Sequence, residues 1–155
     1  MRRILWTAVG LFAVGTVAVA ADAVAIKLGD FKIKPTNVGA GAELYGHDEV
    51  EGKLFLYVNA TAAAEFEATE DGEVKVVIEA SGTKGEKDLP KFKLTVGGTV
   101  VEKEFLLKQA DAKAYTFKAT VKKGKQKVEI EFLNDEYKEN EYDSNLFLHS
   151  VKVGK

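Results

Sequence analysis

The sequence predicts an all-β protein, an antiparallel β-sandwich of the jelly-roll type. Three observations predict this class. After residue 23, helical periodicity is almost absent, and short runs alternate apolar with polar residues. Turn residues separate these runs, for example Gly97-Gly98, which is typical of a tight hairpin. No run is long enough for a long helix, and strands repeated at intervals of about 8–12 residues favour a sandwich or barrel.

The alternating runs set the expected strands. The clearest strands are expected at residues 74–80, 91–96, 99–107, 115–121, 128–132 and 145–153. Further strands are expected at residues 54–58, 64–68 and, less clearly marked, 24–33. Residues 60–64 also fit a single helical turn, which is too short to change the class. Phe92, Phe117, Ile130 and Phe132 are expected in the core, because they lie on the apolar face of their runs.

The N-terminus is typical of a secretory signal peptide at residues 1–20. Arg2 and Arg3 precede an uncharged apolar run, and Ala18-Val19-Ala20 supplies the small residues of a cleavage site. An uncleaved membrane anchor is the alternative, since the run is about long enough to cross a bilayer. We expect the signal peptide to be cleaved, which leaves a secreted, periplasmic or cell-surface protein without a membrane segment. The mature chain is expected to form one domain at residues 24–155.

The charge and composition exclude several classes of function. The net charge of −2 becomes more negative when the two arginines of the signal peptide are removed, which argues against a nucleic-acid partner. The sequence has no cysteine, so no disulfide supports the fold. It has only two histidines, His47 and His149, and no serine in a G-x-S-x-G motif, so nucleophilic catalysis has little support. We expect no enzyme; a hydrolase would need an aromatic cleft with two facing carboxylates, which is hard to build at this size.

One connection between two expected strands is unusually acidic. Between Phe132 and Leu146 it has a single lysine, Lys138, and five carboxylates, at Asp135, Glu136, Glu139, Glu141 and Asp143. Hard cations such as calcium take six to eight oxygen ligands from carboxylates, amides, main-chain carbonyls and water. Asp135, Asp143 and Asn145 supply short side chains of this kind, and Glu139, Asn140 and Glu141 supply longer ones. The spacing is not that of an EF-hand, and it leaves open a solvated acidic loop with no metal.

Two motifs stand at the ends of this connection, Phe132-Leu133-Asn134-Asp135 and Asp143-Ser144-Asn145-Leu146. They resemble the motifs of the calcium-dependent xylan-binding carbohydrate-binding modules. The resemblance extends more loosely over residues 38–153. It departs from the family at Ser144, where arginine is common, and at His149, where an acid is common.

The resemblance implies a non-catalytic jelly roll in which calcium contacts sugar hydroxyls. It implies Asp135 and Asp143 as carboxylate ligands, Tyr142 as the main-chain carbonyl ligand, and Asn145 as a further ligand or orienting residue. Four further residues of the loop, Tyr137, Glu139, Asn140 and Glu141, are expected to contact a xylan-like polysaccharide. Because Trp6 is the only tryptophan and lies in the signal peptide, a stacking platform is expected from Tyr137, Tyr142 or Tyr45. The alternative is a structural or adhesion sandwich at the cell surface, in which calcium only stiffens the loop and the partner is a protein.

Overall fold

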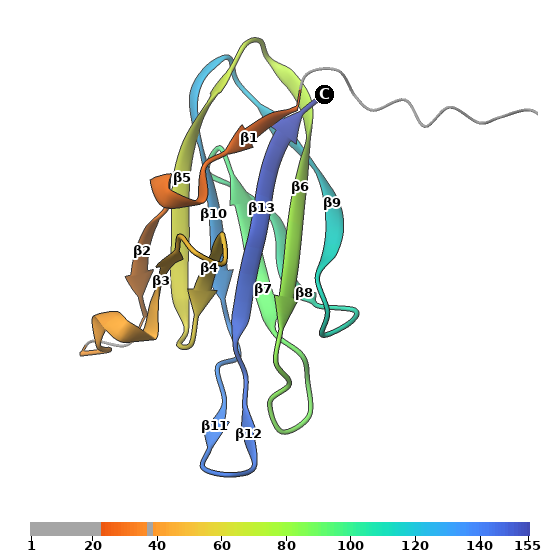
Figure 1. Cartoon of the computed structure of the whole chain (residues 1–155). Helices are drawn as coiled ribbons and strands as arrows, with labels where there is room; N and C mark the ends of the chain where they lie inside the picture. The colour runs from red at the N-terminus through yellow and green to blue at the C-terminus, as the bar shows by residue number, and fades with distance from the viewer. Residues whose placement is uncertain (1–22, 37–38) are drawn as a thin grey trace, which may run out of the picture.

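The computed structural model describes residues 23–36 and 39–155, which form two antiparallel sheets packed face to face (Figure 1). This confirms the all-β sandwich predicted from the sequence. The predicted signal peptide, residues 1–20, lies outside the described residues. Within the described ranges, no helix is long and apolar enough to cross a membrane.

The strands divide between two large sheets and one small hairpin. The first sheet has the order β3-β4-β13-β6-β9, with β1 also paired to β13. Its strands are β1 (Val24–Ile26), β3 (Tyr45–Asp48), β4 (Lys53–Leu56), β6 (Gly72–Gly82), β9 (Lys113–Val121) and β13 (Leu146–Gly154). The second sheet has the order β2-β5-β10-β7-β8. Its strands are β2 (Lys32–Pro35), β5 (Ala60–Ala68), β7 (Lys91–Val96), β8 (Thr99–Leu106) and β10 (Gly124–Phe132).

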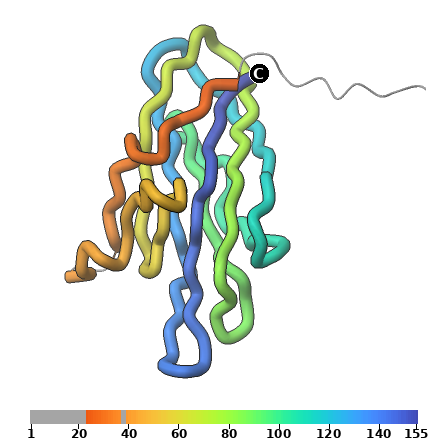
Figure 2. The backbone as a smooth tube through the Cα atoms, viewed as in Figure 1, coloured from red at the N-terminus to blue at the C-terminus, as the bar shows by residue number. Residues whose placement is uncertain are grey.

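Two short strands and two short 3-10 helices complete the described elements. The strands β11 (Tyr137–Lys138) and β12 (Tyr142–Asp143) pair as a small hairpin at one end of the sandwich. The 3-10 helices are η1 (Leu28–Asp30) and η2 (Ala42–Leu44). Strand β13 runs from this hairpin to the C-terminus at the opposite end (Figure 2).

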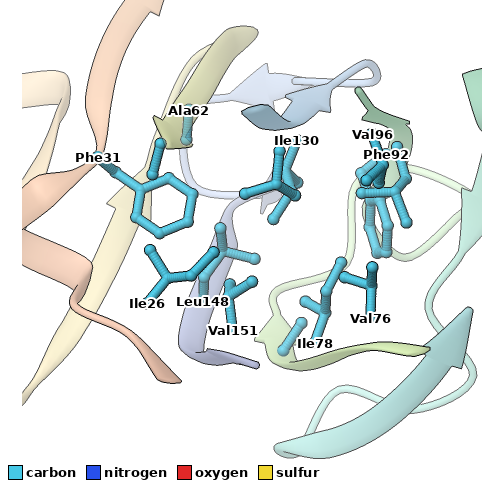
Figure 3. Packing of buried hydrophobic residues seen from close by; sticks show 14 of the residues in the cluster. Ile26, Phe31, Ala62, Val76, Ile78, Phe92, Val96, Ile130, Leu148 and Val151 are labelled. Carbon is cyan, nitrogen blue, oxygen red and sulfur yellow. The ribbon is translucent and has the colours of Figure 1, made fainter. Parts of the chain in front are cut away.

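The core lies between the two sheets and follows the alternation of the sequence. In β10, Val128, Ile130 and Phe132 are fully buried, because successive side chains of a strand point to opposite faces. The labelled core side chains of both sheets converge in Figure 3. Phe92 is also fully buried as expected, whereas Phe117 is only partly buried and packs edge-on against it, with ring centroids 5.9 Å apart.

Strand β13 contains a β-bulge at His149. Leu146 and Leu148 are buried, and the next buried residue is Val151 rather than residue 150. The pairing with β6 shifts between Leu148 and Ser150, so one extra residue enters the strand. The bulge therefore restores the apolar face of β13 to the core after a break in the alternation.

Several local features differ from the sequence-based expectation. Residues 60–64 form no helical turn but the first half of β5, whose alanines pair with β10 and β2. Pairing and burial thus outweigh the intrinsic helix propensity of alanine. Strands β3, β11 and β12 were not expected, since they are short and lack a clear apolar alternation. The Gly97-Gly98 hairpin is confirmed, with φ of 57° and 80° at the two glycines.

The connection from β9 to β10 crosses from one sheet to the other and is fixed by Asp71. The Asp71 carboxylate accepts hydrogen bonds from the backbone N–H of Lys123 at 2.7 Å and from Nζ of Lys122 at 3.1 Å. These two donors stabilise the charged carboxylate and lower the pKa of Asp71, the backbone N–H most strongly.

Candidate metal centre

The acidic connection folds into the β11–β12 hairpin, which separates its carboxylates into two groups. Tyr137 pairs with Asp143 and Lys138 with Tyr142, so the residues between them form the tip. At the tip, Nζ of Lys138 lies 2.7 Å from Oε1 of Glu141, and Asn140 adopts a positive φ of 60°. Asparagine tolerates this left-handed conformation better than most residues. The tip carboxylates are therefore solvated and offset by the single lysine of the hairpin.

The base of the hairpin borders a cavity of about 550 Å³ beside the first sheet. Its lining residues are Leu44, Tyr57, Val58, Asp135, Tyr137, Asp143, Asn145 and Phe147. The structure thus brings together four of the predicted site residues, namely Asp135, Tyr137, Asp143 and Asn145. The other four, Glu139, Asn140, Glu141 and Tyr142, belong to the hairpin but are not in this lining.

Two of the cavity residues have buried oxygens that make no hydrogen bond. These atoms are Asp135 Oδ1 and Asn145 Oδ1. Within residues 23–36 and 39–155, the only other such side-chain atom is Ser144 Oγ, on the same segment. A buried polar atom without a partner is costly, so each needs an explanation. Electron-rich oxygens left free beside a cavity are what a bound cation requires.

The electrostatics at Asp135 point the same way. Burial raises the pKa of the Asp135 carboxyl, and the nearby carboxylates of Asp143 and Glu136 raise it further. A cation would reverse both effects, since it favours the charged carboxylate and neutralises the repulsion. The backbone N–H of Asp135 donates to Asn59 Oδ1 at 2.8 Å, which fixes the main chain at this position.

The donor set fits a hard cation that takes oxygen ligands. Two carboxylates and one amide oxygen are short of the six to eight ligands of calcium, which leaves positions for main-chain carbonyls, water or ligand oxygens. The described residues contain no group of three or more His, Cys, Asp or Glu side chains arranged to hold a metal. The cavity lining has no His or Cys, so a metal that prefers nitrogen or sulfur ligands does not fit here.

Thr83, which lies between β6 and β7, holds the segment that carries Asp143 and Asn145. Its Oγ1 accepts a hydrogen bond from the backbone N–H of Asn145 at 2.9 Å and donates one to the carbonyl of Asp143. The backbone N–H of Thr83 also donates to the Asn145 carbonyl at 3.0 Å. Three hydrogen bonds from one residue thus position both Asp143 and Asn145.

The comparison with protein families identifies the chain. Residues 75–155 match the family CBM60, the calcium-dependent, xylan-binding carbohydrate-binding modules. The chain belongs to this family. The match covers the hairpin and all the cavity residues from Asp135 onward. No curated protein matches the chain significantly.

Solved structures of carbohydrate-binding modules share the fold of this module. The CBM36-1 domain of a xylanase from the hindgut metagenome of Trinervitermes trinervoides has a TM-score of 0.62 and 13% identity, covering 86% of this chain and 98% of that one. A family 35 module from Clostridium thermocellum has a TM-score of 0.58 and 16% identity, with the same coverage. A CBM36 solved with calcium and xylotriose has a TM-score of 0.50 and 15% identity, covering 86% of this chain and 99% of that one.

The aromatic residues at the module's cavity differ from those expected. Tyr137 lines the cavity and is 69% exposed, but Tyr45 packs against the core and Tyr142 is not in the lining. The other aromatic wall is formed by Tyr57 and Phe147. Both lie in alternating runs of the first sheet, and the sequence does not show that β4 and β13 are neighbours.

Sequence reasoning also missed the residues that brace the module's site. Neither Asn59 nor Thr83 was expected at the site. Both act through contacts with residues more than fifty positions away in the sequence. No local pattern signals such contacts, so only the structure reveals them.

Proposed function

We propose that this module is a secreted, non-catalytic protein that binds xylan-like polysaccharide through calcium held at the base of the β11–β12 hairpin. Asp135 and Asp143 would supply the carboxylates and Asn145 the amide oxygen. Calcium in this site would offer its open coordination positions to neighbouring hydroxyls of the sugar. Tyr57, Tyr137 and Phe147 would contact the apolar face of the same sugar.

The observation that carries this proposal is the pair of buried, unpartnered oxygens of Asp135 and Asn145 at one cavity. The raised pKa of Asp135 supports it, because burial and like charges at a carboxylate favour cation binding. Membership in a calcium-dependent, xylan-binding family supports the choice of ion and ligand. Membership in a family of carbohydrate-binding modules supports a non-catalytic role.

The test is a calcium titration by calorimetry, followed by titration with xylo-oligosaccharides with and without chelator. Asp143→Asn keeps the size of the side chain and removes one charge, so calcium affinity should fall by at least about tenfold. Glu141→Gln is the matched control, because it removes one charge from the same hairpin at a residue outside the cavity lining. Circular dichroism checks the fold of both variants.

The outcomes separate this proposal from a structural role for the ion. Glycan binding that survives chelator and Asp143→Asn would contradict the calcium-dependent mechanism. Calcium binding by the wild type without binding to any glycan would favour the structural or adhesion sandwich. Export is tested separately, by mass spectrometry of the protein from its native host, where the chain should begin near Ala21.

A further inference from the structure

The outer face of the first sheet carries a strip of aromatic side chains next to the cavity. In β4, Leu54 and Leu56 are fully buried, so the side chain of Phe55 points outward. Tyr57, the first residue after β4, is also exposed on this face. In β13, Leu146 and Leu148 are likewise buried, so Phe147 points outward beside them. We call Phe55, Tyr57 and Phe147 the aromatic strip.

The three rings of the aromatic strip are in contact. The ring centroids of Phe55 and Tyr57 are 5.0 Å apart, and those of Tyr57 and Phe147 are 6.0 Å apart in an edge-on arrangement. Phe55 and Phe147 are direct partners across the β4–β13 pair. The strip is therefore one continuous apolar surface and not three isolated rings.

Small residues flank the aromatic strip on both sides. Gly46 of β3 pairs with Phe55, and Ser81 of β6 pairs with Phe147. A Cβ atom at Gly46 would lie 3.0 Å from Cζ of Phe55, so the ring lies against the backbone of the glycine. Glycine here lets the ring lie low on the sheet, and neither neighbour stands above the strip.

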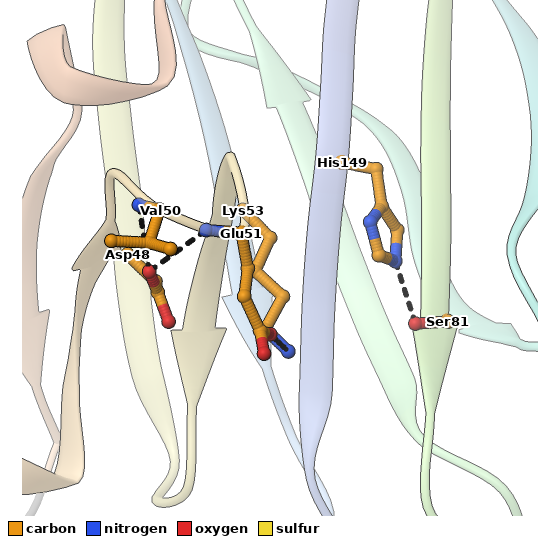
Figure 4. A network of polar contacts seen from close by, with 6 residues as sticks. All are labelled: Asp48, Val50, Glu51, Lys53, Ser81 and His149. Carbon is orange, nitrogen blue, oxygen red and sulfur yellow. Dashed lines mark hydrogen bonds and ion pairs between the residues drawn. The ribbon is translucent and has the colours of Figure 1, made fainter.

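Polar groups border the same surface. Nζ of Lys53 lies over the face of the Phe147 ring, 4.7 Å from its centroid, and pairs with the carboxylate of Glu51. On the other side, Nε2 of His149 and Oγ of Ser81 are 2.7 Å apart (Figure 4). A sugar ring has an apolar C–H face and an edge of hydroxyls, so apolar rings bordered by donors and acceptors match it.

The aromatic strip is continuous with the proposed calcium cavity. Tyr57 and Phe147 belong to both, because they also line the cavity with Asp135, Asp143 and Asn145. Phe55 extends the surface beyond the cavity along β4. A chain of linked sugars bound at the cavity can thus continue over Phe55 without leaving the apolar surface.

We propose that the aromatic strip is a second sugar subsite, so that the module binds several consecutive residues of one linear glycan chain. One sugar residue sits at the cavity, and the next lie over Phe55, where the ammonium of Lys53 donates a hydrogen bond to a sugar hydroxyl. This inference rests on the proposed function. It adds that affinity depends on chain length and that Phe55 sets this dependence.

The experiment measures affinity for xylo-oligosaccharides of two to six residues by calorimetry in calcium. Wild-type affinity should rise with chain length. Phe55→Leu should weaken binding of the hexasaccharide about threefold to tenfold, the range of an aromatic contact, and leave the disaccharide unchanged. Phe55→Tyr keeps an aromatic ring and should bind the hexasaccharide nearly as tightly as the wild type. Val100→Ala, which trims an exposed apolar side chain on β8 of the other sheet, is the control and should change nothing.

The outcomes distinguish the two proposals. If the wild type binds oligosaccharides in a chelator-sensitive way but with equal affinity at all lengths, the second subsite is refuted and the proposed function stands. The subsite is also refuted if Phe55→Leu binds the hexasaccharide as tightly as the wild type. If the wild type binds no oligosaccharide at any length, both proposals fail. A calcium affinity that is unchanged in folded Phe55→Leu confirms that the variant acts on the sugar and not on the ion.

Discussion

Replacing Thr83 with valine tests whether the β6–β7 connection holds the proposed metal ligands in place. Valine has nearly the shape of threonine but lacks the hydroxyl. Thr83→Val removes the hydrogen bond from the backbone N–H of Asn145 and the one to the carbonyl of Asp143. It keeps the bond from its own backbone N–H to the Asn145 carbonyl. The variant therefore loosens the segment that carries Asp143 and Asn145 without removing either proposed ligand.

The magnitude follows from the two lost hydrogen bonds. A typical intramolecular hydrogen bond contributes about 0.5–1.5 kcal/mol net, which gives about 1–3 kcal/mol for the pair. Because Thr83 is exposed, water can replace part of the lost hydrogen bonding. We therefore expect the free energy of unfolding to fall by about 1 kcal/mol. If calcium binding must order the segment that Thr83→Val has loosened, about the same free energy is lost from calcium binding. This corresponds to an increase of about fivefold in the Kd for calcium.

Urea denaturation and calcium calorimetry measure the two effects. Thr83→Ser retains the hydroxyl and should behave nearly as the wild type. Thr95→Val makes the same substitution on β7, where no side-chain hydrogen bond involves Thr95 in the described residues, and should leave calcium affinity unchanged. If Thr83→Val binds calcium as tightly as the wild type, Thr83 does not position the ligands. If Thr83→Ser weakens binding equally, the hydroxyl is not the cause.

Three further predictions concern the ion, the core and the link between the sheets. Calcium at a hundredfold excess over its Kd should stabilise the fold by about 2.7 kcal/mol, seen as a raised Tm that chelator reverses; an unchanged melting curve would exclude a strong site. Phe132→Ala should cost about 3–5 kcal/mol in urea denaturation, because Phe132 is fully buried; a cost below 1 kcal/mol would contradict the packing. Because the pKa of Asp71 is lowered in the folded protein, its charged carboxylate stabilises the fold at pH values above the unfolded pKa of about 3.9. This stabilisation is lost as the pH falls through the folded pKa. Asp71→Asn should therefore be less stable than the wild type at pH 7 and approach it as the pH falls through the folded pKa of Asp71; a difference that does not shrink with pH would refute the role of the charge.

Much of the fold follows from local pattern. The alternation in β7, β9 and β10 is strict, and a strand's period of two depends only on neighbouring residues, so these strands are readable from the sequence. The Gly97-Gly98 turn is equally local, because a positive φ at two successive residues strongly favours glycine. The motifs that begin at Phe132 and Asp143 also lie within short segments, and they pointed to Asp135, Asp143 and Asn145 before any pairing was known.

What the sequence does not encode locally is which strands become neighbours. The alanines of β5 fit a helical turn until β10 and β2 pair with them, and the bulge at His149 makes sense only beside β6. The cavity is likewise a product of tertiary structure. Tyr57 reaches it because β4 pairs with β13, although the two strands lie far apart in the chain. Thr83 and Asn59 hold the proposed ligands for the same reason, since a hydrogen bond depends on distance in space and not on separation along the sequence.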